Sequence, residues 1–280
     1  MSTILITGAA GSLGSILTDI YAEQGHTVRA YDINEAGLAD LKQKYGTNIR
    51  AIYGDVTDRD RLEFALRGVD IVIHTAAMKN IIISESNVEQ TIKTNINGTL
   101  NVAMSAMAQG VKKAIFISSD KSVESVLVYG DSKALGEKIW KWSHSISRQS
   151  IFSIIRPGNF WESRGNVFET WDRQVKDGNQ ITLTDPQMER YFIPTVDVAR
   201  FVLQVEDMMQ GGEIYIPHMK LYNMHELAEE YAKKHGCGIK ITGAREGEKL
   251  IEQLWSQHES SEVQNKNNYL QDKSNYWIIK

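Results

Sequence analysis

The sequence has almost no cysteine and no long hydrophobic run. Cys237 is the only cysteine of the 280 residues, so no disulfide can form within the chain. No stretch reaches the roughly 18 continuous apolar residues that mark a membrane-spanning helix, and residues 1–30 lack the basic start and apolar run of a signal peptide. We therefore expect a cytoplasmic protein that has no membrane partner.

The sequence also lacks an excess of charge of either sign. Its formal net charge is −4, and acidic and basic residues are interleaved along the chain. This distribution offers no basic surface, so we expect no nucleic acid partner. The seven histidines have no metal-ligand spacing, so we expect no metal site. The content of 42% apolar and 24% charged residues is typical of a globular chain.

Short apolar runs alternate with longer amphipathic segments through residues 1–157. Runs such as "TILITG" and "DIVIHTAA" are typical of strands that are buried on both faces. Several amphipathic segments begin with Ser, Asp or Asn at a capping position. This alternation predicts an α/β fold with a Rossmann-like, doubly wound parallel sheet. The predicted strands are 3–8, 27–32, 49–55, 70–77, 113–119 and 152–158, and the predicted helices are 12–25, 34–45, 58–67, 87–109 and 130–147.

The alternating pattern weakens after about residue 157. We expect residues 158–198 to be rich in loops, and a helical and mixed region follows them. The sequence therefore predicts a Rossmann domain with the catalytic residues at 1–157 and a smaller C-terminal substrate-binding lobe, mainly at 158–280. Some segments of the second range are expected to return to the first domain.

The turn after the first predicted strand, "ITGAAGSLGS", has glycines three residues apart at Gly8, Gly11 and Gly14. Glycine lets the backbone approach a pyrophosphate, and the N-terminus of the following helix attracts its negative charge. Asp32 ends the next strand, where a carboxylate can accept a hydrogen bond from an adenosine ribose hydroxyl. Because Asp32 would repel a 2′-phosphate, we expect NAD rather than NADP as cofactor. A tight turn followed by a solvated acid is the alternative.

The segment "ISSDKSVESVLVYGDSK" (117–133) contains two acid/base pairs. Tyr129 and Lys133 lie one helical turn apart, so an ammonium next to the phenol would lower the pKa of Tyr129 and let it take a proton during oxidation. Asp120 and Lys121 add a proton donor and a second base. Elimination of water needs both, because one group removes a proton next to a ketone while the other protonates the departing hydroxyl. A surface pair and a solvated turn are the alternatives.

The spacings "GxxGxxG" and "YxxxK" together resemble the pattern of the extended short-chain dehydrogenase/reductase superfamily. Three more segments are similar to that pattern, namely "GDVTD" (54–58), "HTAA" (74–77) and "TNINGTLNV" (94–102). The resemblance implies that the cofactor is bound by Gly8, Gly11, Ser12, Leu13, Gly14, Asp32, Asp55, Val56, Ala76, Ala77, Lys79, Asn95, Tyr129 and Lys133.

The segment 117–133 also resembles "STDKA…NVYGATK" of the nucleotide-sugar 4,6-dehydratases that act on UDP-N-acetylglucosamine in capsule, O-antigen and flagellin glycosylation. Four other segments agree: "AAMKNIIISESN", "RPGNFWESRGNVF", "ITLTDPQMERYFIPTVD" and "GAREGEKLIEQLWS". The resemblance implies that Asp120, Lys121 and Tyr129, together with Lys133, are catalytic. It also implies a substrate site formed by Lys79, Ser119, Asn159, Ser163, Arg164, Arg190, Arg245 and Glu248.

The reaction implied by this resemblance consists of oxidation of the sugar by NAD, elimination of water and reduction, which yields a UDP-4-keto-6-deoxy-N-acetylhexosamine. A nucleotide-sugar 4-epimerase or ketoreductase of the same fold is the nearest alternative. A non-catalytic NAD-sensing protein is another, although it would have no need for two acid/base pairs.

Two predicted helices, 87–109 and 130–147, resemble those that form a four-helix dimer interface in relatives, so we expect a homo-oligomer. The terminal "NYWIIK" resembles the closing strand of the dehydratases. We interpret four tryptophans as residues of the core or of the interface between the lobes: Trp140, Trp142, Trp161 and Trp171.

Overall fold

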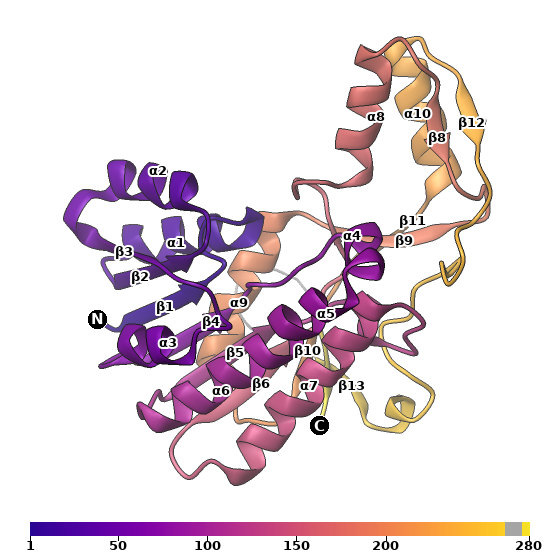
Figure 1. Cartoon of the computed structure of the whole chain (residues 1–280). Coiled ribbons are helices and arrows are strands. Elements are labelled where there is room, and N and C mark those ends of the chain that lie inside the picture. Colours follow the sequence, from indigo (N-terminus) through magenta and orange to yellow (C-terminus); the bar gives the residue numbers. More distant parts are fainter. Residues whose placement is uncertain (267–275) are drawn as a thin grey trace.

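The structure, a computed structural model, describes residues 1–266 and 276–280, and its main feature is a nine-stranded sheet (Figure 1). In spatial order the strands are β13 (Val263–Lys266), β14 (Tyr276–Ile279), β10 (Ile214–Pro217), β6 (Ile151–Ile155), β5 (Lys113–Ile117), β4 (Ile71–His74), β1 (Thr3–Thr7), β2 (Thr27–Asp32) and β3 (Ile49–Tyr53). The strands from β10 to β3 are parallel, whereas β14 is antiparallel to both of its neighbours.

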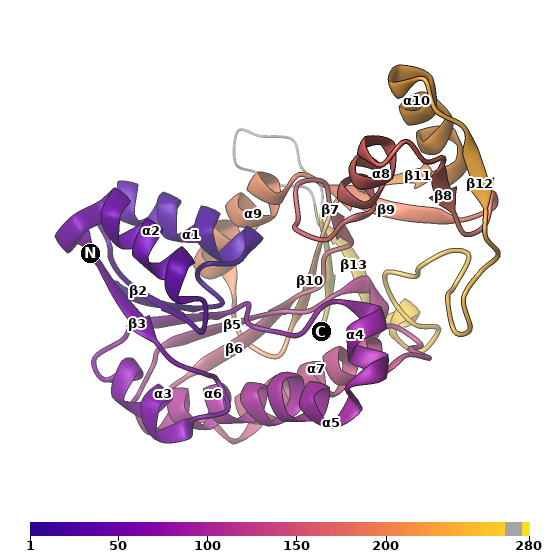
Figure 2. The same ribbon diagram turned by 45° about the horizontal axis from the view of Figure 1, so that its top comes forward.

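Helices cover both faces of this sheet, as Figure 2 shows. One face carries α1 (Ser12–Glu23), α2 (Glu35–Tyr45) and α9 (Thr195–Met208), and the other carries α3 (Arg59–Leu66), α5 (Val88–Thr91), α6 (Gly98–Ala108) and α7 (Val128–Ile146). Shorter helices are η1 (Gly46–Asn48), α4 (Ile81–Ser86), η3 (Asp120–Ser122) and η4 (Glu259–Ser261). The predicted doubly wound α/β fold is confirmed. Within the described residues, no helix has both the length and the apolar content needed to span a membrane.

The central strands are buried on both faces. Ile4, Leu5 and Ile6 of β1 are all fully inaccessible, although successive side chains of a strand point to opposite faces. Helices on both sides therefore account for the continuous apolar runs in the sequence. The strand order reverses between β1 and β4, and ligands of open α/β sheets bind at the carboxyl ends of the strands next to such a reversal.

The prediction that residues 158–198 form a loop-rich region is wrong. The range contains β7 (Asn159–Phe160), α8 (Val167–Lys176), β8 (Ile181–Leu183) and β9 (Glu189–Ile193), and α9 begins before it ends. These strands are short, and their partners are distant in sequence: β8 pairs with β12 (Ile239–Ile241), and β9 pairs with β11 (Lys220–Asn223) as well as β7. A local hydrophobic pattern cannot show such a pairing.

These elements, together with α10 (Met224–His235), surround a second and smaller hydrophobic core. Its buried side chains are Trp171, Ile181, Leu183, Met188, Phe192, Met224, Ala228 and Ala232. In Figure 1 this lobe stands apart from the large sheet. The segments α9, β10, β13 and β14 belong to the large sheet and its helices, whereas the lobe boundary at residue 157 stays a prediction.

The predictions for the terminal segment and for the four tryptophans are only partly confirmed. Residues 276–279 of the expected closing strand form β14, and Asn275 lies outside the described residues. Trp140 and Trp171 are fully buried, and Trp161 packs against the smaller core. The interpretation of Trp142 as a core residue is wrong, because this side chain is 46% exposed on α7.

Candidate active site

The glycine turn between β1 and α1 is tightly packed. Gly8 has φ = +71°, a conformation that glycine adopts without strain, and a Cβ there would lie 2.7 Å from Thr75 Oγ1. A Cβ on Gly14 would lie only 2.1 Å from the carbonyl oxygen of Gly8. The turn therefore depends on glycine at both positions.

Helix α1 begins directly after this turn with an N-terminus that has no side-chain cap. Gly11 is the N-cap residue, and its own N–H donates to the Gly8 carbonyl at 3.0 Å. The first backbone N–H groups of a helix have no acceptor inside the helix. In the described part of the chain, the N–H groups of Ser12, Leu13 and Gly14 have no backbone acceptor outside the helix either. Together with the helix dipole they form a site suited to an anion such as pyrophosphate.

Asp32 connects the glycine turn to the end of β2. Its Oδ2 accepts a hydrogen bond from Ala10 N at 2.8 Å, and its Oδ1 accepts one from Asn34 N at 2.9 Å. A carboxylate oxygen has two lone pairs, so Asp32 can still accept hydrogen bonds from a diol.

Asp55 and Val56 follow β3 at the same edge of the sheet. Asp55 Oδ1 accepts from Thr57 N at 2.8 Å, and its carbonyl oxygen accepts from Tyr31 Oη at 2.7 Å. Val56 is 5% exposed, and a Cβ on Gly98 of α6 would come within 2.6 Å of it. The segment is thus held between the sheet and α6.

Asn95 lies in the π-helix η2 (Ile92–Asn97), a rare geometry that often marks functional sites. Its Oδ1 accepts from Met78 N at 2.8 Å, and its Nδ2 donates to the Met78 carbonyl at 2.9 Å and to Ser132 Oγ at 3.0 Å. Asn95 therefore fixes the segment that begins with Ala76 and Ala77 against α7.

The Asp120–Lys121 pair follows β5 and forms η3. Lys121 Nζ donates to Asp120 Oδ1 at 3.0 Å and to Asn159 Oδ1 at 3.2 Å. Ser119 caps η3, and its hydroxyl also donates to Asp120 Oδ1 at 3.0 Å. Asp120 is fully buried, and its Oδ2 has no hydrogen-bond partner among the described residues. One carboxylate oxygen is thus held in place while the other is available to a ligand.

The pKa values in this cluster respond to burial and to neighbouring charges. Burial alone would lower the pKa of Lys121, but the charges of Asp120 and Glu252 outweigh it and raise the pKa, against the opposing charge of Arg190. Burial raises the pKa of Tyr129 by more than the charge of Lys121 and a hydrogen bond with Ser119 lower it.

Lys133 is on α7 with Tyr129, as predicted, but its contacts differ from the expectation. Its Nζ donates to the carbonyl of Ile117 at 2.6 Å and lies 4.2 Å from the ring centroid of Phe116. Burial, only partly offset by Glu137, lowers the pKa of Lys133 to about 7. The raised pKa of Tyr129 is opposite to the expected direction, and the charge that lowers this pKa is that of Lys121 instead of Lys133, while the charge of Asp120 raises it.

A cavity of about 170 Å³ lies at this cluster. Its lining comes from α4, η3, α7, β7, β9 and the loop that contains residues 247–252. Its lining includes Lys121, Tyr129, Asn159, Arg190, Glu248 and Glu252. The acid/base residues and part of the predicted substrate site therefore share one cavity.

Arg190 makes contacts that the sequence did not indicate. Its Nη1 donates to the carbonyls of Glu189 at 2.8 Å and Leu250 at 2.9 Å, and its Nη2 donates to that of Lys249 at 2.8 Å. Its guanidinium thus holds the 248–250 loop in place, with Glu248 at 3.8 Å. Arg245 is exposed, and its N–H donates to Glu248 Oε2 at 3.3 Å.

Three other predicted substrate residues meet at the N-terminus of α1 instead of at the cavity. Arg164 N donates to Ser12 Oγ at 3.1 Å, and Lys79 Nζ donates to the carbonyl of Arg164 at 2.7 Å. Ser163 precedes Arg164, and its hydroxyl is 3.5 Å from the carbonyl oxygen of Phe160. The loop that carries Ser163 and Arg164 therefore contacts the predicted pyrophosphate site, and Lys79 of the loop after β4 contacts that loop.

Two charged residues of the cavity lining, Lys249 and Glu252, were missed by the sequence analysis. Lys249 Nζ donates to the carbonyl of Val123 at 2.5 Å, and Glu252 is a carboxylate that is only 6% exposed. Both belong to the segment "GAREGEKLIEQLWS" (243–256), which carries part of the resemblance to the dehydratases. The buried position of Glu252 depends on how this segment docks, so no local signal could have shown it.

A buried ion-pair network supports the cluster from behind. Arg156 donates bidentately to Glu137, at 3.0 and 2.7 Å, and contacts Glu259 at 2.8 Å. Glu137 also accepts from Ser118 at 2.6 Å and from Ser122 at 2.8 Å, on either side of Asp120 and Lys121. The network therefore joins α7, β6 and the C-terminal segment to the active-site turn.

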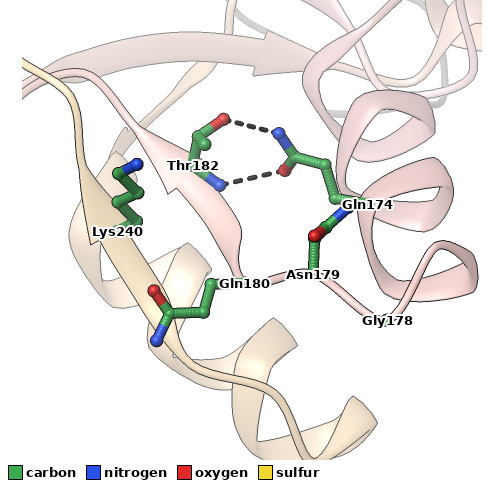
Figure 3. A pocket seen from close by; sticks show the side chains of 6 residues that line it. All are labelled: Gln174, Gly178, Asn179, Gln180, Thr182 and Lys240. Atoms are coloured by element: carbon green, nitrogen blue, oxygen red, sulfur yellow. Dashed lines mark hydrogen bonds between the residues drawn. The ribbon is translucent and has the colours of Figure 1, made fainter.

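A second cavity, of about 440 Å³, lies in the smaller lobe between α8, β8 and β12 (Figure 3). Figure 3 shows the amide of Gln174 facing Thr182, with hydrogen bonds of 2.8 and 2.9 Å between them. The only charged side chain in its lining is Lys240. It lacks an acid/base pair, so the cavity at Lys121 is the candidate active site.

The strand order of the large sheet, the glycine turn at its reversal and the Tyr129/Lys133 pair after β5 define an extended short-chain dehydrogenase/reductase. More particularly, the chain belongs to the polysaccharide biosynthesis protein family, whose model matches residues 4–274.

Similar proteins include members with and without a known activity. An uncharacterized membrane protein of Methanocaldococcus jannaschii is 38% identical over 265 residues, covering 90% of this chain and 80% of that protein. A UDP-N-acetylglucosamine 4,6-dehydratase (inverting) of Campylobacter jejuni serotype O:23/36 is 37% identical over 263 residues, covering 92% of this chain and 78% of that protein. The X-ray structure of Pen from Bacillus thuringiensis superposes with a TM-score of 0.91 at 29% identity, covering 99% of this chain and 87% of Pen.

Proposed function

We propose that this protein is a nucleotide-sugar 4,6-dehydratase that converts UDP-N-acetylglucosamine to a UDP-4-keto-6-deoxy-N-acetylhexosamine. The observation that carries the proposal is the 3.0 Å contact between Lys121 Nζ and Asp120 Oδ1, made at the cavity that Tyr129 also lines. Oxidation alone needs one base, whereas elimination needs an additional acid and base. The relative from Campylobacter jejuni, named for this reaction, supports the same conclusion.

We propose NAD as the cofactor, because the residues at the β1–α1 turn fit it. The uncapped N-terminus of α1 suits a pyrophosphate, and Asp32 at the end of β2 suits a ribose diol. Solved structures that share the fold are described in complex with NAD. When bound, NAD supplies a hydride acceptor at carbon 4 of the sugar and returns the hydride within the same turnover.

The protein's own residues would handle the protons. Tyr129, ionised to the phenolate, takes the proton of the 4-hydroxyl, and the nearby charge of Lys121 favours this ionised form. A shift of one proton from Lys121 Nζ to Asp120 Oδ1, across their hydrogen bond, converts the ion pair into a neutral base and a neutral acid. Lys121 then removes the proton from carbon 5, and Asp120 protonates the 6-hydroxyl, which leaves as water, so that a double bond forms between carbons 5 and 6. Return of the hydride to carbon 6, and of a proton held by Tyr129 or Lys121 to carbon 5, gives the 4-keto-6-deoxy sugar.

We further propose that the reaction inverts carbon 5. The name of the Campylobacter jejuni relative specifies an inverting reaction. In the proposed scheme carbon 5 loses a proton and becomes trigonal, and it then regains a proton and is tetrahedral again in the product. Its configuration is therefore the one that the reaction can change. Proton NMR coupling constants of the freshly formed product would distinguish inversion from retention.

The decisive experiment is incubation of the NAD-loaded protein with UDP-N-acetylglucosamine, followed by mass spectrometry. Dehydration removes the mass of one water molecule. An unchanged mass with an altered sugar configuration would indicate a 4-epimerase, and a gain or loss of two hydrogens would indicate a reductase. An unchanged substrate would favour the NAD-sensing alternative.

We also propose a homodimer formed through helices α5 to α7. Leu135, Trp142 and Ile146 follow helical spacing on α7 and are 42%, 46% and 49% exposed. Leu100 of the neighbouring α6 is 37% exposed. Exposed apolar side chains gathered on one surface favour association. Leu135→Glu should therefore shift sedimentation toward a monomer, whereas Ile241→Glu, at a similarly exposed residue of the smaller lobe, should not. A wild-type monomer would contradict the proposal.

A further inference from the structure

Glu252 is a buried carboxylate in the cavity that no step of the proposed mechanism uses. It is 6% exposed and lines the cavity together with Lys121, Tyr129 and Asn159. Its Oε2 is inaccessible to solvent and has no hydrogen-bond partner in the described part of the chain. A buried polar group without a partner is costly, because it has lost its hydrogen bonds to water.

Glu252 shares its cavity with the proposed base Lys121 and with Tyr129. The negative charge of Glu252, after that of Asp120, raises the pKa of Lys121. The other carboxylate oxygen of this cluster that is buried without a partner is Oδ2 of Asp120. Lys121, whose ammonium contacts Asp120, and Glu252 therefore line the same cavity.

The chemistry of a carboxylate limits what it can bind. An ionised carboxylate only accepts hydrogen bonds, so its partner must be a hydroxyl or an N–H group. It repels a phosphate. The diphosphate is therefore excluded, and because Glu252 lines the same cavity as Lys121 and Tyr129, the sugar is favoured over the ribose hydroxyls and the uracil N–H group.

We propose that Glu252 binds the sugar of the substrate, its carboxylate accepting a hydrogen bond from a hydroxyl or amide N–H group next to the reacting carbons. This inference rests on the proposed function for the identity of the sugar nucleotide. In that function the 4-hydroxyl is used by Tyr129 and the 6-hydroxyl by Asp120. The donor for Glu252 is then the 3-hydroxyl or the N–H of the acetamido group.

The test compares the binding of UDP with that of UDP-N-acetylglucosamine by calorimetry. The NAD-loaded Tyr129→Phe protein serves as the parent, so that substrate is not consumed. Glu252→Gln keeps the shape but removes the charge, and Glu252→Leu removes the acceptor. Hydrogen bonds to charged groups account for about a ten- to hundred-fold change in affinity. We expect about a ten-fold loss for Gln and a larger loss for Leu with the sugar nucleotide, and no loss with UDP.

Glu246→Gln is the matched control, because it removes the same charge from an exposed residue of the same segment. It should bind both ligands like the parent, and Glu252→Asp should recover part of the lost affinity. In the otherwise wild-type enzyme, Glu252→Gln should raise KM for the sugar nucleotide. Thermal unfolding should show that Glu252→Gln is folded, since the substitution removes no protein hydrogen bond of Glu252 and only its charge interaction with Lys121.

Three results would overturn the inference. These are equal losses for UDP and the sugar nucleotide, no loss for either ligand, or a loss that Glu246→Gln reproduces. Failure of the proposed function looks different: the parent would then bind UDP-N-acetylglucosamine no better than UDP, before any change at Glu252 is made.

Discussion

At the scale of single residues, the site separates two proton-transfer tasks. Tyr129 stands on α7, whereas Asp120 and Lys121 stand on the turn after β5 and contact each other at 3.0 Å. The side chain of Asp120 is fully buried and that of Lys121 is 19% exposed. Because an uncompensated buried charge is costly, each of these two groups depends on its partner.

Substitution of these residues should stop the reaction at different steps. Tyr129→Phe should prevent any reduced nicotinamide from appearing when substrate is added, because the first proton acceptor is gone. Asp120→Asn and Lys121→Met should allow oxidation but stall elimination, so that the absorbance of reduced nicotinamide accumulates in stopped-flow traces. Loss of a positioned acid or base costs about a hundred- to ten-thousand-fold in rate.

A matched control for Tyr129→Phe is Tyr53→Phe, at a tyrosine that is 59% exposed at the end of β3. It should keep the wild-type traces. Near-normal dehydration by Asp120→Asn or Lys121→Met would mean that this pair is structural, and the epimerase or reductase alternative would gain.

Lys133 should make stability depend on pH in the neutral to alkaline range. Its folded-state pKa of about 7 lies below the ordinary value of 10.5, so between these values the unfolded chain binds the proton more strongly. Stability therefore rises with pH across this window, with a slope of up to about 1.4 kcal/mol per pH unit. Below pH 7 the cost of protonating a buried amine is fully present.

Urea unfolding of the wild type and of Lys133→Met from pH 7 to 10 checks this, with both proteins free of cofactor. The difference in unfolding free energy should move in favour of the wild type as pH rises. Parallel pH profiles for the two proteins would contradict the lowered pKa of Lys133.

At the scale of elements, helix α1 packs tightly against the glycine turn, and Gly14 leaves no space there for a side chain. Gly14→Ala would place a Cβ 2.1 Å from the Gly8 carbonyl oxygen, so α1 would have to move away from the turn. We expect a loss of about 1–3 kcal/mol in stability, typical of overpacking, and a clear loss of NAD affinity in calorimetry. Ser15→Ala on the same helix adds no atom and should bind NAD normally. Unchanged affinity in Gly14→Ala would place the pyrophosphate elsewhere.

At the scale of the whole molecule, the proposed reaction removes a hydride from the sugar and returns it to the same sugar in the same site. A substrate that carries deuterium at carbon 4 should give a product with that deuterium at carbon 6, because the hydride does not leave the complex. Proton and deuterium NMR of the product measure this transfer. Loss of the label, or a requirement for one NAD per product, would point to a reductase.

The sequence determined those features that short segments carry by themselves. The alternation of apolar and amphipathic segments determined the doubly wound sheet, since each buried strand is recognisable from its own residues. The glycine turn, and the catalytic candidates within 117–133, are likewise local, because the carboxyl end of one strand and the helix after it bring them together.

Only the tertiary structure decided what depends on distant partners. The strands of the smaller lobe escaped prediction because β8 and β9 pair with strands far along the chain. The guanidinium of Arg190 holds backbone carbonyls of residues 189, 249 and 250, and Glu252 reaches the cavity only when its segment docks there. The pKa of Tyr129 is raised because burial outweighs nearby charge. Burial and electrostatic balance are sums over neighbours in space, and spacing along the chain does not contain them.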